Sequence, residues 1–484
     1  MRGSLLAIAL LFALGAAAQN KIQVKLAPEL KGPYTGRLIV YTQADTTKGF
    51  TGPEEPGYAI EVKNWKAGEV QTITAKAATF LKSLDSLKGH FKFVAILDTN
   101  TKERGTSAPG NLYTRKEDVF ELGNGSSPAV LTLTHVFKDR VFNQSDSVKE
   151  VVFKTVLVSQ FRKEPIYLKA GVVLPPSYHK EPNRVYPVVY VIPGWGGTHH
   201  NANSQGHRNA YGVGKGEEKI FVFLNPDTHD PFGLHAVIDS RVNGPWGSAL
   251  VKELMPYMVK NYRASADPKL SFLTGQSTGG YAVIWLALHF PKHFGGSWST
   301  APDPVDFSNF LGVNIYKDKN FYQDNSGKDR EIYLIKGVNQ TTLRKMVQKE
   351  LLDGDGGQHQ AFEAEFGEMG KDNRPVQLFD GKTGIINRKV AESWKPYDLA
   401  LYVQQNWPGL KDKVGSKIRI YVGEDDNFML QHSVRAFSER IKTVNATIYT
   451  EFIKGADHFN TRGLVAKRVQ EEMDALIKQE KLQQ

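Results

Sequence analysis

The sequence predicts a protein of the α/β class, in which a mainly parallel, doubly wound sheet follows a unit rich in β-structure. Three observations support this prediction. Residues 151–484 alternate short apolar strands with helical stretches, as expected for a parallel sheet with helices on both faces. Residues 19–150 instead hold short alternating strands between turn-rich stretches. The 484 residues suffice for two domains, and 40% hydrophobic with 23% charged residues is typical of globular proteins.

The N-terminal segment 19–150 is predicted to form a β-sandwich-like domain. Its strand candidates alternate in polarity or are β-branched, and Gly- and Pro-bearing turns separate them. The candidates are residues 22–26, 36–41, 70–73, 91–97 and 129–133. Because this segment contains no catalytic constellation, we expect an accessory domain.

Residues 151–484 are predicted to form the catalytic domain. The expected strands are 151–159, 166–174, 185–192, 220–224, 270–273, 297–300, 418–422 and 448–453, and the expected helices include 247–262, 281–290 and 461–479. Chemistry is expected at the carboxyl ends of the parallel strands. Between about 302 and 400 the alternation breaks down, so we expect an insertion that forms a lid or a wall of the substrate pocket.

The first 18 residues have the pattern of a cleaved secretory signal peptide. Arg2 supplies a positive charge, residues 5–14 form a short apolar core, and Ala16, Ala17 and Ala18 give a small-residue cleavage site before Gln19. No other segment approaches the length of a transmembrane helix, so we expect no stable membrane anchor. The predicted location is secreted or periplasmic.

Composition excludes several kinds of chemistry. The chain has no cysteine, which rules out disulfides, thiolate catalysis and cysteine zinc sites. The net charge of +10 is spread over many segments, so the sequence favours a basic surface over a nucleic-acid site. No metal-ligand or cofactor motif is present, and we expect neither a metal nor a cofactor.

Ser277 lies in a motif typical of a nucleophilic serine. An apolar strand precedes it, an apolar helical run follows it, and the motif itself is Gly275-Gln276-Ser277-Thr278-Gly279. A serine at the tip of a sharp strand-to-helix turn has a strained backbone, and larger neighbours would clash there. The hydroxyl is thereby exposed for attack.

A serine hydroxyl needs a histidine base and an acid that orients the imidazole. Asp426 follows the predicted strand 418–422, and His458 follows the predicted strand 448–453. This order of serine, acid and histidine is the one expected on such a sheet. We therefore predict a Ser277–Asp426–His458 triad.

Alternatives remain for each partner at this stage. Asp425 and Glu424 compete with Asp426 for the role of the acid. His458 could be an exposed loop residue, and Asp457 beside it is expected to be a solvated loop carboxylate.

The oxyanion hole is predicted after the strand 185–192, in Pro193-Gly194-Trp195-Gly196-Gly197. Glycines there allow the backbone to approach a substrate carbonyl. The backbone amides of Trp195 and Thr278 are the expected donors, each contributing about 3 to 4 kcal/mol to transition-state stabilisation.

Further polar residues follow the predicted strands without an assigned role. His199 and His200 follow the oxyanion loop, Asn243 to Gly247 precede the helix 247–262, and Asp303 and Asp306 follow the strand after the serine. Each could contact substrate, or could form a turn or pack in the protein.

Residues from about 165 to 475 resemble the putative-esterase family of α/β-hydrolases, which includes esterase D-like, feruloyl-esterase-like and enterochelin-esterase-like enzymes and the mycolyltransferases. The matching residues are the motif around Ser277, the segment Gly423 to Asp426, and His458. The resemblance implies an α/β-hydrolase fold, with these residues as nucleophile, acid and base. The chain departs from the family in having Pro193-Gly194 where many members have His-Gly, and in its insertion before Asp426.

The expected activity is a secreted or periplasmic serine carboxylesterase that forms an acyl-enzyme on a small-molecule or saccharide ester. Aryl esters, acetylated sugars, siderophore lactones and short-chain esters are all candidate substrates. Two alternatives are an acyltransferase, in which an alcohol replaces water, and a catalytically silent ligand-binding protein that has kept the scaffold.

Overall fold

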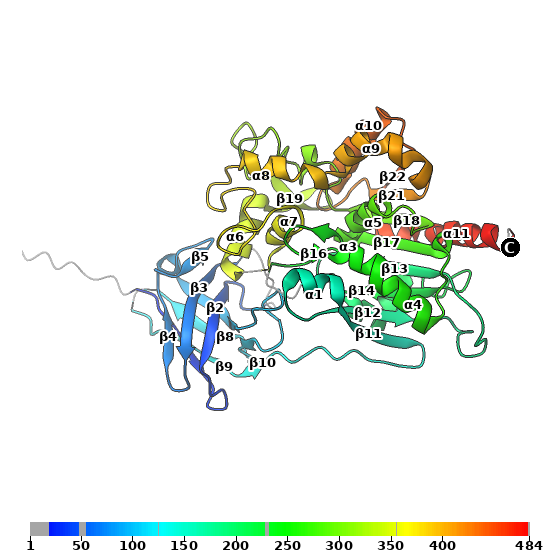
Figure 1. The fold of residues 1–484 in the computed structure, drawn as a ribbon. Helices are drawn as coiled ribbons and strands as arrows, with labels where there is room; N and C mark the ends of the chain where they lie inside the picture. Colours follow the sequence, from blue (N-terminus) through cyan, green and yellow to red (C-terminus); the bar gives the residue numbers. More distant parts are fainter. Residues whose placement is uncertain (1–18, 48–54, 124, 228–231, 355, 483–484) are drawn as a thin grey trace, which may run out of the picture. The chain divides into compact units, whose positions relative to one another are not determined.

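The computed structural model describes residues 19–47, 55–123, 125–227, 232–354 and 356–482 (Figure 1). The predicted signal peptide lies outside these described residues. The chain divides into two compact units: Met1–Thr99 with Gly110–Phe137, and Asn100–Pro109 with Lys138–Gln484. Among the described residues we find no helix with the length and apolar character needed to cross a bilayer.

The first unit consists of two sheets that enclose one core. A three-stranded sheet has the order β4 (Val70–Ile73), β1 (Ile22–Leu26), β9 (Ala129–Leu133). The larger sheet has the order β10 (His135–Val136), β7 (Leu112–Tyr113), β6 (Gly89–Asp98), β2 (Tyr34–Gln43), β3 (Gly57–Trp65), β5 (Ala78–Phe80), with β8 (Asp118–Leu122) on β6. Alternate residues of both sheets, including Val24, Leu38 and Phe93, share one buried cluster, the arrangement of a β-sandwich.

The second unit is built on an eight-stranded sheet. Its order is β11 (Val148–Thr155), β12 (Ile166–Val173), β14 (Ile220–Leu224), β13 (Val188–Ile192), β17 (Ser271–Ser277), β18 (Gly296–Pro302), β21 (Ile418–Gly423), β22 (Tyr449–Ile453). The strands from β14 to β22 are parallel, whereas β11 and β12 join antiparallel. The mainly parallel α/β fold predicted from the sequence is confirmed.

Both faces of this sheet are covered, and strand β13 shows why. Its sequence is continuously apolar, as expected for a strand buried on both sides. Val188, Tyr190 and Ile192 belong to a core that includes α5 (Thr278–His289). Val189 and Val191 point to the other face, where they share a core with α11 (Thr461–Lys481).

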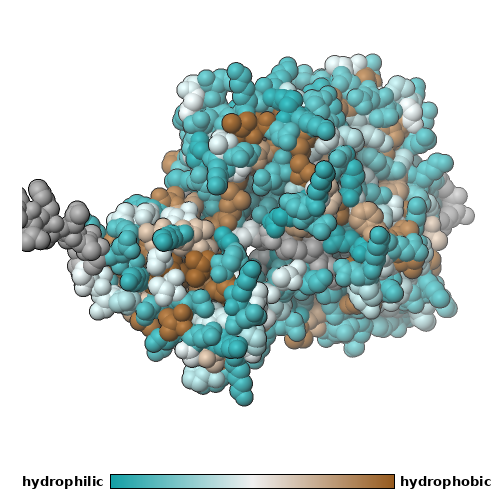
Figure 2. Space-filling view, turned by 60° about the vertical axis from the view of Figure 1, so that its left-hand side comes forward, coloured by the Kyte–Doolittle hydropathy of each residue, from teal (hydrophilic) through white to brown (hydrophobic). Residues whose placement is uncertain are grey.

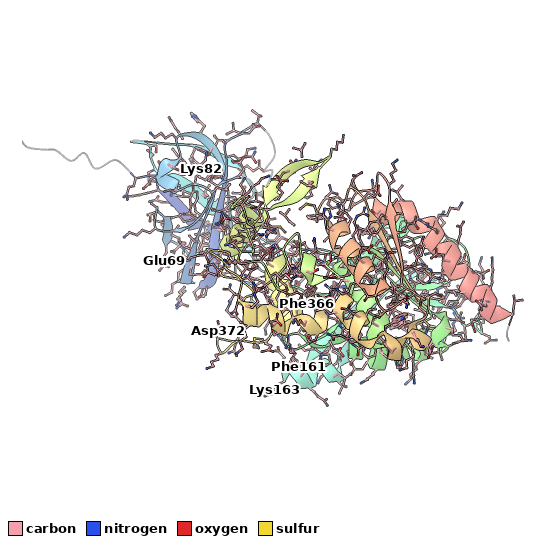
Figure 3. All side chains as sticks on the ribbon, turned by 90° about the horizontal axis from the view of Figure 1, so that it is seen from above. Glu69, Lys82, Phe161, Lys163, Phe366 and Asp372 are labelled. Atoms are coloured by element: carbon pink, nitrogen blue, oxygen red, sulfur yellow. The ribbon has the colours of Figure 1, made fainter. Side chains whose placement is uncertain are left out.

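The segment between β18 and α9 (Leu399–Val414) has its own elements and an aromatic core. It contains the hairpin β19 (Glu331–Ile335) and β20 (Val338–Thr342), followed by α6 (Leu343–Asp353), α7 (Gln358–Phe366) and α8 (Arg388–Ser393). Phe366, labelled in Figure 3, packs against Phe307 and Trp394 with ring centroids 5.1 and 5.4 Å apart. These contacts form an aromatic core within the segment. Phe366 also packs against Tyr281 of α5, with ring centroids 5.3 Å apart, and this contact attaches the segment to the sheet domain through apolar burial.

Two helices differ from the expectation. Residues Val156–Arg162 form helix α1, although the pattern predicts that the strand continues to 159. Helix α1 begins there because Thr155 caps the amide of Val158, and the carboxylate of Glu253 accepts hydrogen bonds from the first two helical amides, 3.0 and 2.9 Å long. The sequence around residues 156–162 does not reveal this contact, because Glu253 lies nearly 100 residues further along the chain.

The predicted helix 247–262 is interrupted. It consists of α3 (Trp246–Ala249), a π-helical turn at Leu250–Leu254, and α4 (Met255–Tyr262). Pro256 has no N–H to donate to the preceding turn, which accounts for the irregular turn beside it.

The face of the protein seen in Figure 2 is mostly hydrophilic, and apolar residues form separate patches on it.

Candidate active site

Ser277 is the last residue of β17, and α5 begins at the next residue. Its backbone has φ 57° and ψ −123°, a conformation that L-residues rarely adopt. The chain therefore turns sharply from strand to helix at this serine, as the motif predicts.

The glycines beside Ser277 are required by close backbone approach. A Cβ atom on Gly275 would lie 2.2 Å from the carbonyl oxygen of Gly279, and one on Gly279 would lie 1.9 Å from that of Ile192. Both distances are far below van der Waals contact. Only glycine at these positions lets α5 begin directly against β13 and β17.

His458 and Asp426 form a buried hydrogen-bonded pair. The imidazole Nδ1 lies 2.9 Å from Asp426 Oδ2, while Asp426 Oδ1 accepts the amide of Phe428 at 2.9 Å. Both side chains are buried, whereas Asp425 and Glu424 are exposed. The structure thus brings Asp426, rather than either neighbouring carboxylate, to the histidine.

A second contact holds the histidine loop near the serine. His458 donates its amide to Asn427 Oδ1 at 3.1 Å and accepts a 2.6 Å hydrogen bond from Gln276 Nε2 at its carbonyl. Gln276 lies between Gly275 and Ser277 in the motif, and its side chain therefore holds the loop that carries the histidine. Asp457 instead accepts two amides within its own loop.

The hydroxyl of Ser277 contacts Asp303, a carboxylate that has no definite role predicted from the sequence. Ser277 Oγ donates to Asp303 Oδ1 at 3.1 Å, and Thr278 Oγ1 donates to Asp303 Oδ2 at 2.6 Å. In the described part of the chain no hydrogen bond joins Ser277 to His458, although both line one cavity. Burial raises the pKa of Asp303, whereas the hydroxyl of Thr278, nearby His458 and the hydroxyl of Ser277 lower it.

The order of strands in the sheet explains this contact. Asp303 follows β18, the neighbour of β17, so its side chain lies at the same carboxyl edge as Ser277. This position is the signal that singles out Asp303 as a candidate. Asp306, three residues later, instead binds Arg440 at 2.8 Å and caps a short 3-10 turn through the amide of Ser308.

The two predicted oxyanion donors lie in suitable backbone. The loop after β13 passes so close to Ser277 that a Cβ atom on Gly194 would lie 3.0 Å from the Ser277 Cβ, and Trp195 follows. Thr278 is the first residue of α5, where an amide has no acceptor within the helix.

Arg104 supports the predicted oxyanion loop. Its guanidinium carbon lies 4.3 Å from the centroid of the Trp195 ring, and its Nε donates to Asp227 Oδ1 at 2.8 Å. Because Arg104 is about 90 residues from the loop and belongs to no motif, no sequence signal reveals this contact.

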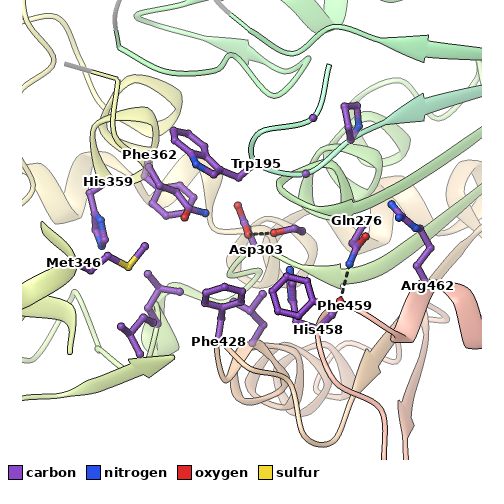
Figure 4. Close-up of a pocket in the computed structure, with 18 of the residues that line it drawn as sticks. Trp195, Gln276, Asp303, Met346, His359, Phe362, Phe428, His458, Phe459 and Arg462 are labelled. Atoms are coloured by element: carbon purple, nitrogen blue, oxygen red, sulfur yellow. Dashed lines mark hydrogen bonds between the residues drawn. The ribbon is translucent and has the colours of Figure 1, made fainter. Parts of the chain in front are cut away.

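A cavity of about 370 Å³ opens over Ser277 (Figure 4). The apolar part of its wall consists of Trp195, Leu311, Ile332, Met346, Phe362, Phe428, Leu430 and Phe459. Its polar groups include Gln276, Asp303, Gln358, His359, His458 and Arg462. The segment after β18 supplies a large share of this wall.

His199, His200 and the segment 243–247 lie outside this cavity wall. His199 bonds Glu150 at 3.0 Å, and burial lowers the pKa of His199 to about 4. Trp246 stacks on His235 with ring centroids 3.7 Å apart. Packing therefore accounts for His199 and for Trp246.

Comparison with known proteins identifies the family. The sequence model of the family described as "Putative esterase" matches residues 167–464, more than half of the chain. Among solved structures, a ferulic acid esterase is 14% identical over 68% of this chain and 98% of its own, with a TM-score of 0.44. A fluorophosphonate-binding serine hydrolase of Staphylococcus aureus is 14% identical over 68% of this chain and 98% of its own, with a TM-score of 0.41.

An S-formylglutathione hydrolase from Agrobacterium tumefaciens is 16% identical over 69% of this chain and 97% of its own, with a TM-score of 0.39. The family match, together with the parallel sheet, supports the resemblance found in the sequence. The chain belongs to the "Putative esterase" family of α/β-hydrolases and is a serine hydrolase of carboxylic esters.

Proposed function

We propose that the protein is an exported serine carboxylesterase in which Ser277, His458 and Asp426 form the catalytic triad. The observation that carries this proposal is the buried 2.9 Å contact between His458 and Asp426, in a cavity that also exposes the strained Ser277. An acid–imidazole pair of this kind fixes the tautomer in which Nε2 can accept a proton.

The reaction has two halves. Ser277 Oγ attacks the ester carbonyl carbon while its proton passes to His458 Nε2, and the amides of Trp195 and Thr278 stabilise the oxyanion. The C–O bond to the alcohol then breaks, and the alcohol leaves with the proton from His458. Water attacks the acyl-enzyme in the same way, which releases the acid and restores the Ser277 hydroxyl.

The cavity favours an ester with an apolar or aromatic portion. Phe362, Phe428 and Phe459 present ring surface, which apolar groups bury favourably. A small-molecule ester, or an ester carried on a saccharide, fits this combination of apolar wall and polar groups.

Hydrolysis of p-nitrophenyl acetate tests the proposal. Replacing Ser277 with Ala removes the nucleophile, so kcat should fall by at least about a thousandfold. Ser271→Ala, at the opposite end of the same strand, is the matched control and should retain activity. Equal rates for wild type and Ser277→Ala would refute the assignment.

A further inference from the structure

Asp303 is the only described residue that accepts a hydrogen bond from the Ser277 hydroxyl, and it is only 3% exposed. Its Oδ1 accepts a hydrogen bond from the hydroxyl of Ser277, and its Oδ2 accepts one from the hydroxyl of Thr278. Its own amide also bonds the Ser277 carbonyl at 3.1 Å. The side chain lines the cavity in which the ester must bind.

Among the described residues no cation forms an ion pair with this carboxyl. The titratable groups that influence its pKa are His458 and Asp426, and Asp303 in turn influences Glu365. Glu365 is 1% exposed, and neither of its carboxyl oxygens has a hydrogen-bond partner among the described residues. Burial raises the pKa of Glu365 well above its usual range, and Asp303 raises it further.

Catalysis requires the Ser277 hydroxyl to leave Asp303. Its proton must point at His458 for attack, and Asp303 Oδ1 then loses the one hydrogen-bond donor that the described residues give it. A buried carboxylate oxygen without a donor is unfavourable, so this rotation is opposed unless a new donor arrives. Protonation of Asp303, or a donor on the substrate, would supply one.

We propose that Asp303 recognises a hydroxyl or ammonium group of the substrate close to the scissile carbonyl. By taking the place of Ser277 on Asp303, this donor frees the nucleophile to bond His458. The inference deepens the proposed esterase function and rests on it. It makes Asp303 a residue that determines specificity.

The distances restrict where the donor can be. Ser277 Oγ lies 3.1 Å from Asp303 Oδ1, and an attacked carbonyl carbon approaches the nucleophile to about 3–3.5 Å. A donor two to four bonds from that carbon, on the acyl side or on the alcohol side, can therefore reach Oδ1. An ester without such a group leaves the carboxylate unsatisfied.

Matched ester pairs test this specificity. The acyl side is tested with the methyl esters of propionate, lactate and alanine, and the alcohol side with 2-hydroxyethyl and propyl butyrate. For each pair, kcat/KM is measured in wild type, Asp303→Asn and Asp303→Ala. The preference of each enzyme is its kcat/KM for the donor-bearing ester divided by its kcat/KM for the plain ester. Dividing the preference of the wild type by that of a variant cancels the differences in intrinsic ester reactivity.

In one of the two series, the preference of the wild type for the donor-bearing ester should fall about tenfold or more in both variants. The loss should arise on the donor-bearing ester, while hydrolysis of the plain ester is unchanged or faster. The series in which the preference falls shows whether the donor lies on the acyl part or on the alcohol part of the substrate. A purely structural role would lower both members of each pair equally.

Asp425→Asn, an exposed carboxylate outside the cavity wall, is the matched control and should leave every ratio unchanged. Unchanged ratios in both Asp303 variants, with Ser277 still labelled by a fluorophosphonate, would overturn the inference. Failure of the esterase proposal looks different, because wild type and Ser277→Ala would then be equally inactive on all esters.

Discussion

Backbone strain at Ser277 is maintained by the packing around it. A positive φ at a non-glycine residue is unfavourable by about 1–3 kcal/mol, and it persists where the surroundings over-determine it. Here Gly275 and Gly279 allow β13, β17 and α5 to meet at backbone contact distance. The result is a hydroxyl held at the edge of the sheet, within reach of groups from neighbouring strands.

The role of Asp426 leads to a prediction at a single residue. Asp426→Asn keeps the shape of the side chain but removes the charge that stabilises the imidazolium, and kcat should fall about 10⁴-fold. Asp425→Asn, one position earlier and exposed, should remain close to wild type. Steady-state kinetics on one ester measures both. Similar losses in the two variants would contradict the assignment of the acid.

At this scale the sequence predicts residue types better than contacts. The motif around Ser277 and the order of the strands were enough to select Asp426 and His458 as candidates. The choice between Asp425 and Asp426 depends on which side chain of the loop turns inward, which spacing alone does not determine. The bond from Ser277 to Asp303 depends on side-chain orientation in a neighbouring loop.

Among the elements, α7 contains two buried glutamates, Glu363 and Glu365. Glu363 is buried and accepts the amide of Leu378 at 2.9 Å, and burial raises the pKa of Glu363 from 4.5 to about 8. The folded protein therefore holds this proton more tightly than the unfolded chain. Stability from this source is complete below about pH 4.5 and is lost as the pH rises through 8.

Glu363→Gln should remove this pH dependence, because an amide keeps the acceptor and never ionises. At pH 7 the variant should be more stable than wild type by about 3 kcal/mol at most. Thermal unfolding from pH 5 to pH 9 measures the difference. Glu439→Gln, at an exposed surface pair, is the control; a Glu363→Gln profile that parallels wild type would contradict the prediction.

Elements formed by local sequence were predictable, and those formed by distant contacts were not. The strand 220–224 and the alternating core of β13 follow directly from apolar runs. Helix α1 depends on Glu253, about 100 residues away. The break before α4 is different, because Pro256 is a local signal within the helical pattern that the expected single helix 247–262 did not take into account.

For the whole molecule, the sequence identified the fold because each unit has its own periodicity and its own core. The first unit buries alternating strand residues, and the second buries continuous strands beneath helices. The segment Asn100–Pro109 belongs with the second unit, although it interrupts the strands of the first. Such long-range packing leaves no trace in local patterning.

Export is the prediction that concerns the whole chain. If residues 1–18 are a signal peptide, the mature protein recovered outside the cytoplasm should begin at Gln19. N-terminal sequencing of that protein measures this. Leu10→Arg places a charge in the apolar core and should leave the uncleaved precursor inside the cell, whereas an exported wild type that retains Met1 would contradict the prediction.

Activation of Ser277 by His458 and Asp426 can be measured by mass spectrometry of the protein after reaction with a fluorophosphonate. We expect one covalent adduct, located on the peptide that contains Ser277, absent from Ser277→Ala and formed far more slowly in Asp426→Asn. An adduct on another residue, or no adduct on the folded wild-type protein, would contradict it.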